Sequence, residues 1–97
     1  MATYIALMKF TDEGIRSVKE TVKRAEAFKE KAKKSGVTVK ETYWVTGRYD
    51  AVSIVEAADD LAATALALTL GTMGNVHTET MRAFGPAEMK HIIEKIG

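Results

Sequence analysis

The chain has 97 residues, enough for one domain with a small core, and its composition of 46% hydrophobic and 28% charged residues is that of an ordinary globular protein. Fourteen basic and 13 acidic side chains leave a net charge near +1, which provides no bulk field to attract nucleic acid or an anionic membrane. The lack of cysteine excludes disulfides and thiol catalysis and fits a reducing compartment, so we expect a cytoplasmic location.

The first predicted element is a strand over residues 3–10. Tyr4, Met8 and Phe10 alternate with Ile5 and Leu7, so both faces of this strand are apolar, as in a central strand that is covered on both sides. No basic segment precedes it, which argues against a signal peptide.

A long amphipathic helix is predicted over residues 12–34. Thr11 can cap its start, acidic residues follow in the first turn, and lysines precede Gly36 at its end. Its apolar residues recur every three or four positions, a stripe that docks on a sheet.

The rest of the chain predicts a hairpin, a helix, a strand and a terminal helix. Residues 37–46 and 50–57 are rich in β-branched and aromatic residues around Gly47, to which we assign a positive φ. A helix that is apolar all round begins near Asp59 and Asp60, and a last strand spans residues 75–84. Glycines and polar residues interrupt the uncharged stretch 61–78, so we expect no membrane span. Pro86 opens a short helix that we expect to pack over the second helix or to reach a neighbouring subunit.

This order predicts an α+β fold, a ferredoxin-like βαββαβ sandwich with an extra C-terminal helix. We expect residues 1–97 to form one domain, with a core over 1–84 and the terminal helix over 86–96. Two helices cover only one face of the sheet, and the apolar residues of the first strand point to both. We therefore expect two copies to pair sheet to sheet as a dimeric α/β barrel with a cavity between the sheets.

A family resemblance rests on the hairpin turn Gly47-Arg48-Tyr49-Asp50. Together with Tyr43-Trp44-Val45 before it, Ile54-Val55-Glu56-Ala57 after it, and Gly74-Asn75-Val76 and Thr78-Glu79-Thr80 later, this turn resembles the GYD-domain family over nearly the whole chain. Arg48 separates the glycine from the Tyr-Asp pair. The resemblance implies a ferredoxin-like domain related in shape to dimeric α/β-barrel proteins, and it supplies no catalytic residues.

The turn itself has two interpretations. Tyr49 and Asp50 can point into an inter-sheet pocket, with Asp50 as a base or a hydrogen-bond acceptor. Alternatively, Asp50 accepts hydrogen bonds from nearby backbone N–H groups and Tyr49 packs at the strand edge, which would make both residues structural.

Other polar residues on the predicted strands have the same two interpretations. Glu56 needs a partner, and Arg82 on the last strand can form an ion pair with it or grip an anionic ligand. His77 and Glu79 share a face and offer two metal ligands, but no second ligand-rich motif accompanies them, so we expect no metal. The basic residues around Arg24 are interspersed with glutamates, which favours a solvated helix face over a polyanion site.

Three functions stay open from the sequence. The first is a self-associating domain that binds a small molecule between its sheets, with Trp44, Tyr43 or Tyr49 as an aromatic wall and Asp50, Glu56 or Arg82 as polar anchors. The second is a cofactor-free oxygenase or isomerase that uses His77 and Asp50, an analogy of fold alone. The third is an assembly protein that forms larger rings. Motifs for phosphate, dinucleotide and RNA binding are missing, so we expect no cofactor and no nucleic acid partner.

Overall fold

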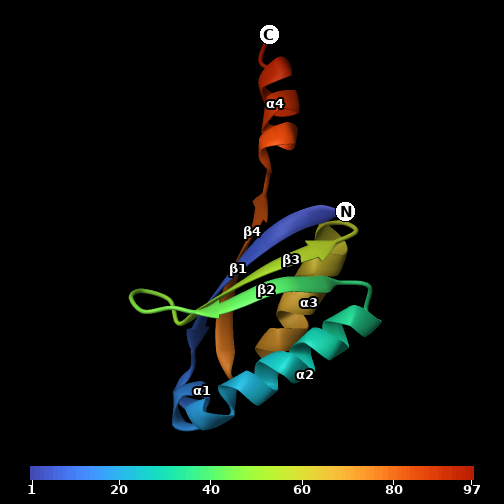
Figure 1. Ribbon diagram of the computed structural model, residues 1–97. Helices are drawn as coiled ribbons and strands as arrows, with labels where there is room; N and C mark the ends of the chain where they lie inside the picture. Colours follow the sequence, from blue (N-terminus) through green and yellow to red (C-terminus); the bar gives the residue numbers. More distant parts are fainter.

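The computed structural model describes all 97 residues, and the predicted order of elements is confirmed (Figure 1). Along the chain the elements are β1 (Ala2–Phe10), α1 (Asp12–Arg16), the 3₁₀ turn η1 (Val18–Glu20), α2 (Thr21–Lys34), β2 (Thr38–Trp44), β3 (Ala51–Ala57), α3 (Asp60–Thr72), β4 (Val76–Ala83) and α4 (Pro86–Glu94). No helix has both the length and the apolar composition needed to cross a membrane.

The four strands form one antiparallel sheet in the order β2-β3-β1-β4, which is compatible with the predicted ferredoxin-like arrangement. Central β1 pairs with β3 and β4 along its length, and α2 and α3 lie on one face. The buried core lies between these helices and the sheet, and it comprises Tyr4, Ala32, Val37, Val39, Val55, Ala57, Ala63 and Leu66.

Alternation along β1 assigns its residues to the two faces of the sheet. Tyr4 and Met8 are buried toward the helices, so Ile5 and Leu7 point to the opposite face, where no element of the chain covers them. In a single copy the sheet is therefore covered on one side only.

The first predicted helix is divided into α1, η1 and α2, which corrects the prediction of one continuous helix. Thr11 caps α1 as expected, its hydroxyl accepting from the Gly14 N–H at 3.0 Å. The break follows at Ser17, whose hydroxyl donates to the Glu13 carbonyl at 2.9 Å. Such back-bonding by serine bends helices, and the Ser17 carbonyl turns to the Arg24 guanidinium instead, 2.8 Å away.

The hairpin turn has the predicted glycine geometry. Gly47 has φ +113°, a conformation that residues with a side chain rarely adopt, and a Val45 N–H to Asp50 carbonyl bond of 2.9 Å closes the turn. The two strands of the hairpin are slightly shorter than the predicted 37–46 and 50–57: β2 ends at Trp44 and β3 begins at Ala51.

Two apolar helices are less covered than the sequence suggested. The exposed fractions of Leu61 and Leu68 on α3 are 81% and 67%, so the chain covers only one side of this helix. Helix α4 does not pack over α3: it projects from the end of β4, away from the rest of the molecule (Figure 1). Met89 and Ile93 on α4 are accordingly exposed by 45% and 56%, and Ile96, just beyond its end, by 74%.

Candidate functional site

Asp50 occupies a structural position in the hairpin turn. Its carboxylate Oδ2 accepts the Phe10 N–H at 2.8 Å, and its own N–H donates to the Met8 carbonyl at 2.8 Å. The half-buried carboxylate thus extends the pairing of β1 and β3 by one step beyond the last paired residues, Met8 and Ala51. This geometry matches the interpretation of Asp50 as a turn residue, and it brings the carboxylate to neither Glu56 nor Arg82.

Tyr49 joins the turn to β4. Its phenol donates to Glu79 Oε2 at 2.5 Å, and this hydrogen bond raises the pKa of Tyr49. Lys9 reaches back to the Arg48 carbonyl at 3.1 Å, and His77 is paired with Lys9 across β1 and β4. Tyr49, Glu79, Lys9 and His77 therefore form a polar group at one end of the uncovered face. No three side chains of the metal-binding types come together in the structure.

The middle of the uncovered face is apolar. The registers of β3 and β4 on β1 place Val52 and Glu79 beside Leu7, and Ile54 and Met81 beside Ile5. Edge strand β2 adds Tyr43 opposite Val52, with its phenol donating to Glu41. We call the set Ile5, Leu7, Tyr43, Val52, Ile54 and Met81 the open face.

Glu56 and Arg82 lie on opposite faces of the sheet, so the predicted ion pair between them is wrong. Glu56 is paired with Thr3 and lies with the open face, where Lys40 Nζ approaches it to 3.9 Å. Arg82 is paired with Tyr4 and shares the helix side. Thr3 and Tyr4 are successive residues of β1, and successive side chains of a strand point to opposite faces of the sheet. Their partners Glu56 and Arg82 are therefore on opposite faces as well.

Arg82 anchors α4 to β4. Its guanidinium donates to Glu88 at 2.8 Å, to the Thr3 carbonyl at 3.3 Å and to the Ala83 carbonyl. It also lies 4.5 Å from the centre of the Phe84 ring, in cation–π geometry. The hydrogen bond from Arg82, supported by the Gly85 N–H, lowers the pKa of Glu88. These contacts make Arg82 a structural link between the strand and the helix.

Trp44 lies on the helix side, away from the other predicted ligand-binding aromatics. Its indole Nε1 donates to the Thr21 hydroxyl of α2 at 3.0 Å, and Trp44 is paired with Ala51, which is buried toward the helices. It cannot line one pocket together with Tyr49, Glu56 and His77, because the sheet separates them. The six predicted site residues therefore do not form a single site.

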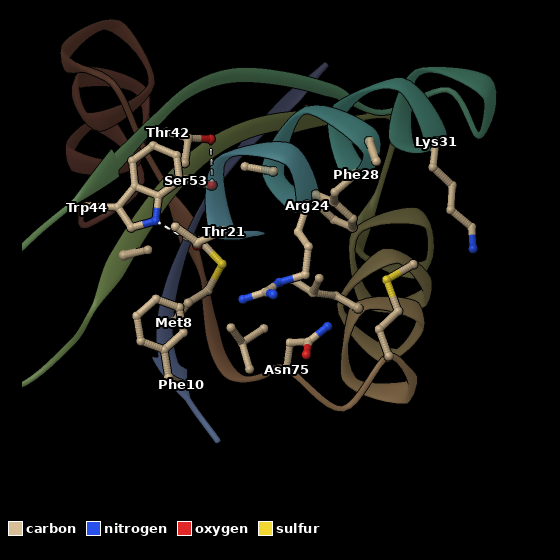
Figure 2. Close-up of a pocket in the computed structure, with 16 residues that line it drawn as sticks. Met8, Phe10, Thr21, Arg24, Phe28, Lys31, Thr42, Trp44, Ser53 and Asn75 are labelled. Atoms are coloured by element: carbon tan, nitrogen blue, oxygen red, sulfur yellow. Dashed lines mark hydrogen bonds between the residues drawn. The ribbon is translucent and has the colours of Figure 1, made fainter. Parts of the chain in front are cut away.

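A cavity of about 190 Å³ opens on the helix side, between α2, the end of α3 and the sheet (Figure 2). It is mostly apolar, and it contains two cationic side chains and no carboxylate. The residues around it are Met8, Phe10, Thr21, Arg24, Ala25, Ala27, Phe28, Lys31, Thr42, Trp44, Ala51, Ser53, Leu70, Met73, Asn75 and Val76.

This cavity was not predicted from the sequence, although α2 contained a signal for it. Thr21, Arg24, Phe28 and Lys31 are spaced by three or four residues, so they lie on one side of the helix. That side faces the cavity, where Thr21, Arg24 and Phe28 are half-buried and Lys31 is exposed. The prediction that Arg24 belongs to a solvated basic face was wrong, because Arg24 is half-buried at the cavity. That prediction rested on the charge balance of the whole helix and not on the side where each residue lies.

Comparisons with known proteins find one family and one relative with similar sequences. The family model for the GYD domain matches residues 4–93 of this chain. A Thermus thermophilus protein named "Glutamine synthetase and cystathionine beta-lyase binding protein" is 36% identical over 90 residues, covering 92% of this chain and 95% of that protein.

Two solved structures are similar at 28% sequence identity. A structure titled "crystal structure of FFRP-DM1" superposes with a TM-score of 0.60 over 87% of this chain and 100% of the other. The structure of TTHA0845 from Thermus thermophilus has a TM-score of 0.56 over 88% of this chain and 95% of the other. With a family match over nearly all of its length, this chain belongs to the GYD-domain family.

Proposed function

We propose that this chain is a binding protein that works as a self-associated unit, in which two copies pair through their open faces. The observation that carries the proposal is the excess of exposed surface. A compact monomer of 10.6 kDa exposes about 5,500 Å². This chain exposes 6786 Å², about 1,300 Å² more, and buries only 12 of its 97 residues. A standard interface removes about 800 Å² per partner, so the excess is sufficient for one.

Helix α4 supports the same proposal. An isolated helix of nine residues is marginal in water, and its stability in a protein comes from packing of its apolar side. Here Met89, Ile93 and Ile96 are exposed, and α4 projects beyond the sheet. We infer that α4 of each copy packs on the partner copy, which places its apolar residues in the same assembly as the open face.

The pairing also defines where a small molecule could bind between the sheets. Tyr49 and His77 lie at one end of the open face and Glu56 at the other. Two facing copies would place these polar groups around the rim of an apolar space. Asp50, Arg82 and Trp44 would not take part.

The partner of the assembly is, in our proposal, a metabolic enzyme. A relative that is 36% identical over most of both chains is named for binding glutamine synthetase and cystathionine beta-lyase. We propose that this chain binds an enzyme of one of these two types. The Asp50 carboxylate, which was the predicted base, accepts the Phe10 N–H in the hairpin turn, so we propose binding and not catalysis.

The oligomer is tested by light scattering coupled to size exclusion at micromolar concentration. We expect the wild type to have about twice the monomer mass of 10.6 kDa, and the open-face variants Leu7→Lys and Ile54→Lys to be monomers. Leu61→Lys on α3 is the matched control, because Leu61 is exposed and lies on the helix side. A wild-type monomer would contradict the proposal whatever the variants do.

The enzyme partner is tested separately by titrating the purified chain into purified glutamine synthetase and into cystathionine beta-lyase in a calorimeter. Saturable binding to either enzyme supports the proposal. A chain that dimerises but gives no heat with both enzymes would overturn the partner and leave the pairing intact.

A further inference from the structure

We propose that the cavity between α2, α3 and the sheet binds a small organic carboxylate with an aromatic or branched apolar body, held by Arg24. This site lies on the opposite face of the sheet from the open face. It is therefore independent of the pairing proposed above.

The positive charge of Arg24 at the cavity is the first observation that supports this proposal. Arg24 is partly buried, and its guanidinium donates to the Ser17 carbonyl at 2.8 Å, the Ser17 hydroxyl at 3.1 Å and the Gly14 carbonyl at 3.4 Å. All three partners are neutral, Arg24 forms no ion pair, and no aspartate or glutamate lies around the cavity. A partly desolvated cation without a counter-ion favours an anionic ligand.

The guanidinium has the geometry for a carboxylate. It carries five N–H donors in a planar fork, and the three bonds to Ser17 and Gly14 leave donors for a ligand. These bonds also fix the side chain, which points toward the middle of the cavity in Figure 2. Lys31 lies two turns further along α2 at the cavity's edge and adds a second positive charge there.

The walls select the body of the ligand. Ten of the 16 residues around the cavity are hydrophobic, among them Phe28, Trp44 and Met73. The volume of about 190 Å³ exceeds the roughly 150 Å³ of an engineered apolar cavity that binds benzene. A six-membered ring with a short acid-bearing arm fits this space, with the ring on the apolar walls and the acid at Arg24.

The polar groups on the sheet side of the cavity are already paired. Thr42 and Ser53 share a hydrogen bond of 3.0 Å, and the Trp44 indole N–H is bonded to Thr21. The apolar part of a ligand can therefore contact this wall without leaving a buried polar group unsatisfied, which would otherwise oppose binding.

The chain supplies its own probe of this site. Trp44 is the single tryptophan, and it borders the cavity, so its fluorescence reports occupancy there. We expect phenylacetate to change Trp44 fluorescence saturably. Phenethylamine, with the opposite charge, and acetate, without the ring, should bind at least tenfold more weakly. Equal responses to phenylacetate and phenethylamine would overturn the proposal, as would no saturable response to phenylacetate.

Variants locate the ligand within the cavity. Arg24→Gln should weaken phenylacetate binding about tenfold, because it removes charge-assisted hydrogen bonds. Arg16→Gln, which removes a guanidinium from exposed α1, should not change it. Ala51→Leu should abolish binding by filling the space while leaving both cations in place. If Arg24→Gln and Ala51→Leu both bind phenylacetate like the wild type, the site is elsewhere and the proposal fails.

Discussion

The phenol of Tyr49 donates a hydrogen bond to Glu79 Oε2 across 2.5 Å, and so connects the hairpin turn to β4 over the end of β1. The two residues are 30 positions apart, and their segments are separated in the sheet by the strand between them. Tyr49 therefore holds the hairpin turn to β4 at the end of the sheet, next to the open face.

Tyr49→Phe should lower the free energy of unfolding slightly at neutral pH, because it removes this hydrogen bond and keeps the ring. The pKa of Tyr49 is raised, so the stabilisation is complete below its unfolded value of about 10 and is lost as the pH rises through the higher folded value. Urea unfolding at one fixed protein concentration should show the two proteins converging at strongly alkaline pH. A gap that is constant up to that pH would mean that the hydrogen bond is not its source.

Asp50→Ala should lower the free energy of unfolding by about 1–2 kcal/mol, as for loss of a side-chain cap on a backbone N–H. Asp50→Asn keeps an oxygen that can accept the Phe10 N–H, so we expect it to lose less than half as much. The comparison is made by chemical unfolding of the three proteins. If the asparagine variant is as unstable as the alanine variant, the negative charge matters more than the acceptor.

Gly14→Ala should destabilise the fold by about 1–3 kcal/mol, although alanine is the better helix former. A Cβ at position 14 would lie 2.0 Å from the Asn75 carbonyl oxygen, a backbone atom that also accepts the Thr11 N–H. Gly71→Ala on α3 is the matched control, because a Cβ there meets nothing within 4 Å. It should stabilise by about 0.5 kcal/mol, and thermal melts of the two variants should therefore shift in opposite directions.

Glu88→Gln should loosen α4 from β4 at neutral pH. The pKa of Glu88 is lowered in the folded chain by its hydrogen bond from Arg82, so the stabilisation is complete above its unfolded value of about 4.3 and is lost as the pH falls through the lower folded value. Amide hydrogen exchange in α4 should be faster in the variant at about pH 6 and equal to the wild type at about pH 2, after correction for intrinsic rates. Glu94→Gln, which removes a carboxylate bonded only to His91 in the same helix, is the control.

The elements of the fold could be predicted from the sequence because their signals are local. The Thr11 cap, the hydrophobic stripe of α2 and the positive φ of Gly47 depend on residues a few positions apart. The division of the first helix was missed because the bond from the Ser17 hydroxyl to the Glu13 carbonyl and the bond from Arg24 to the Ser17 carbonyl do not show in the apolar periodicity that predicted the helix.

The site was harder to predict than the fold, because the face of the sheet on which a side chain lies is known only once the register of the strands is known. In the register of β1, Glu56 is paired with Thr3 and lies on one face, and Arg82 is paired with Tyr4 and lies on the other. Their opposite charges had suggested an ion pair. Trp44 is likewise paired with Ala51 and lies on the helix side, whereas Tyr43, the preceding residue, lies on the open face. A single-residue step decides which surface a side chain joins, and no local pattern reveals that step for short strands that are apolar on both faces.

The alternation of β1 has a practical consequence for genetics on this chain. Met8 belongs to the cavity and its neighbour Leu7 to the open face, with only one layer of backbone between them. Under the two proposals, substitutions at Met8 and Phe10 should change the ligand response, those at Ile5 and Leu7 should change assembly, and those at the core residue Tyr4 should destabilise the fold. A saturation scan of the nine codons of β1 would then separate the two proposed functions at neighbouring positions of one strand, and each class of variant would serve as the control for the other.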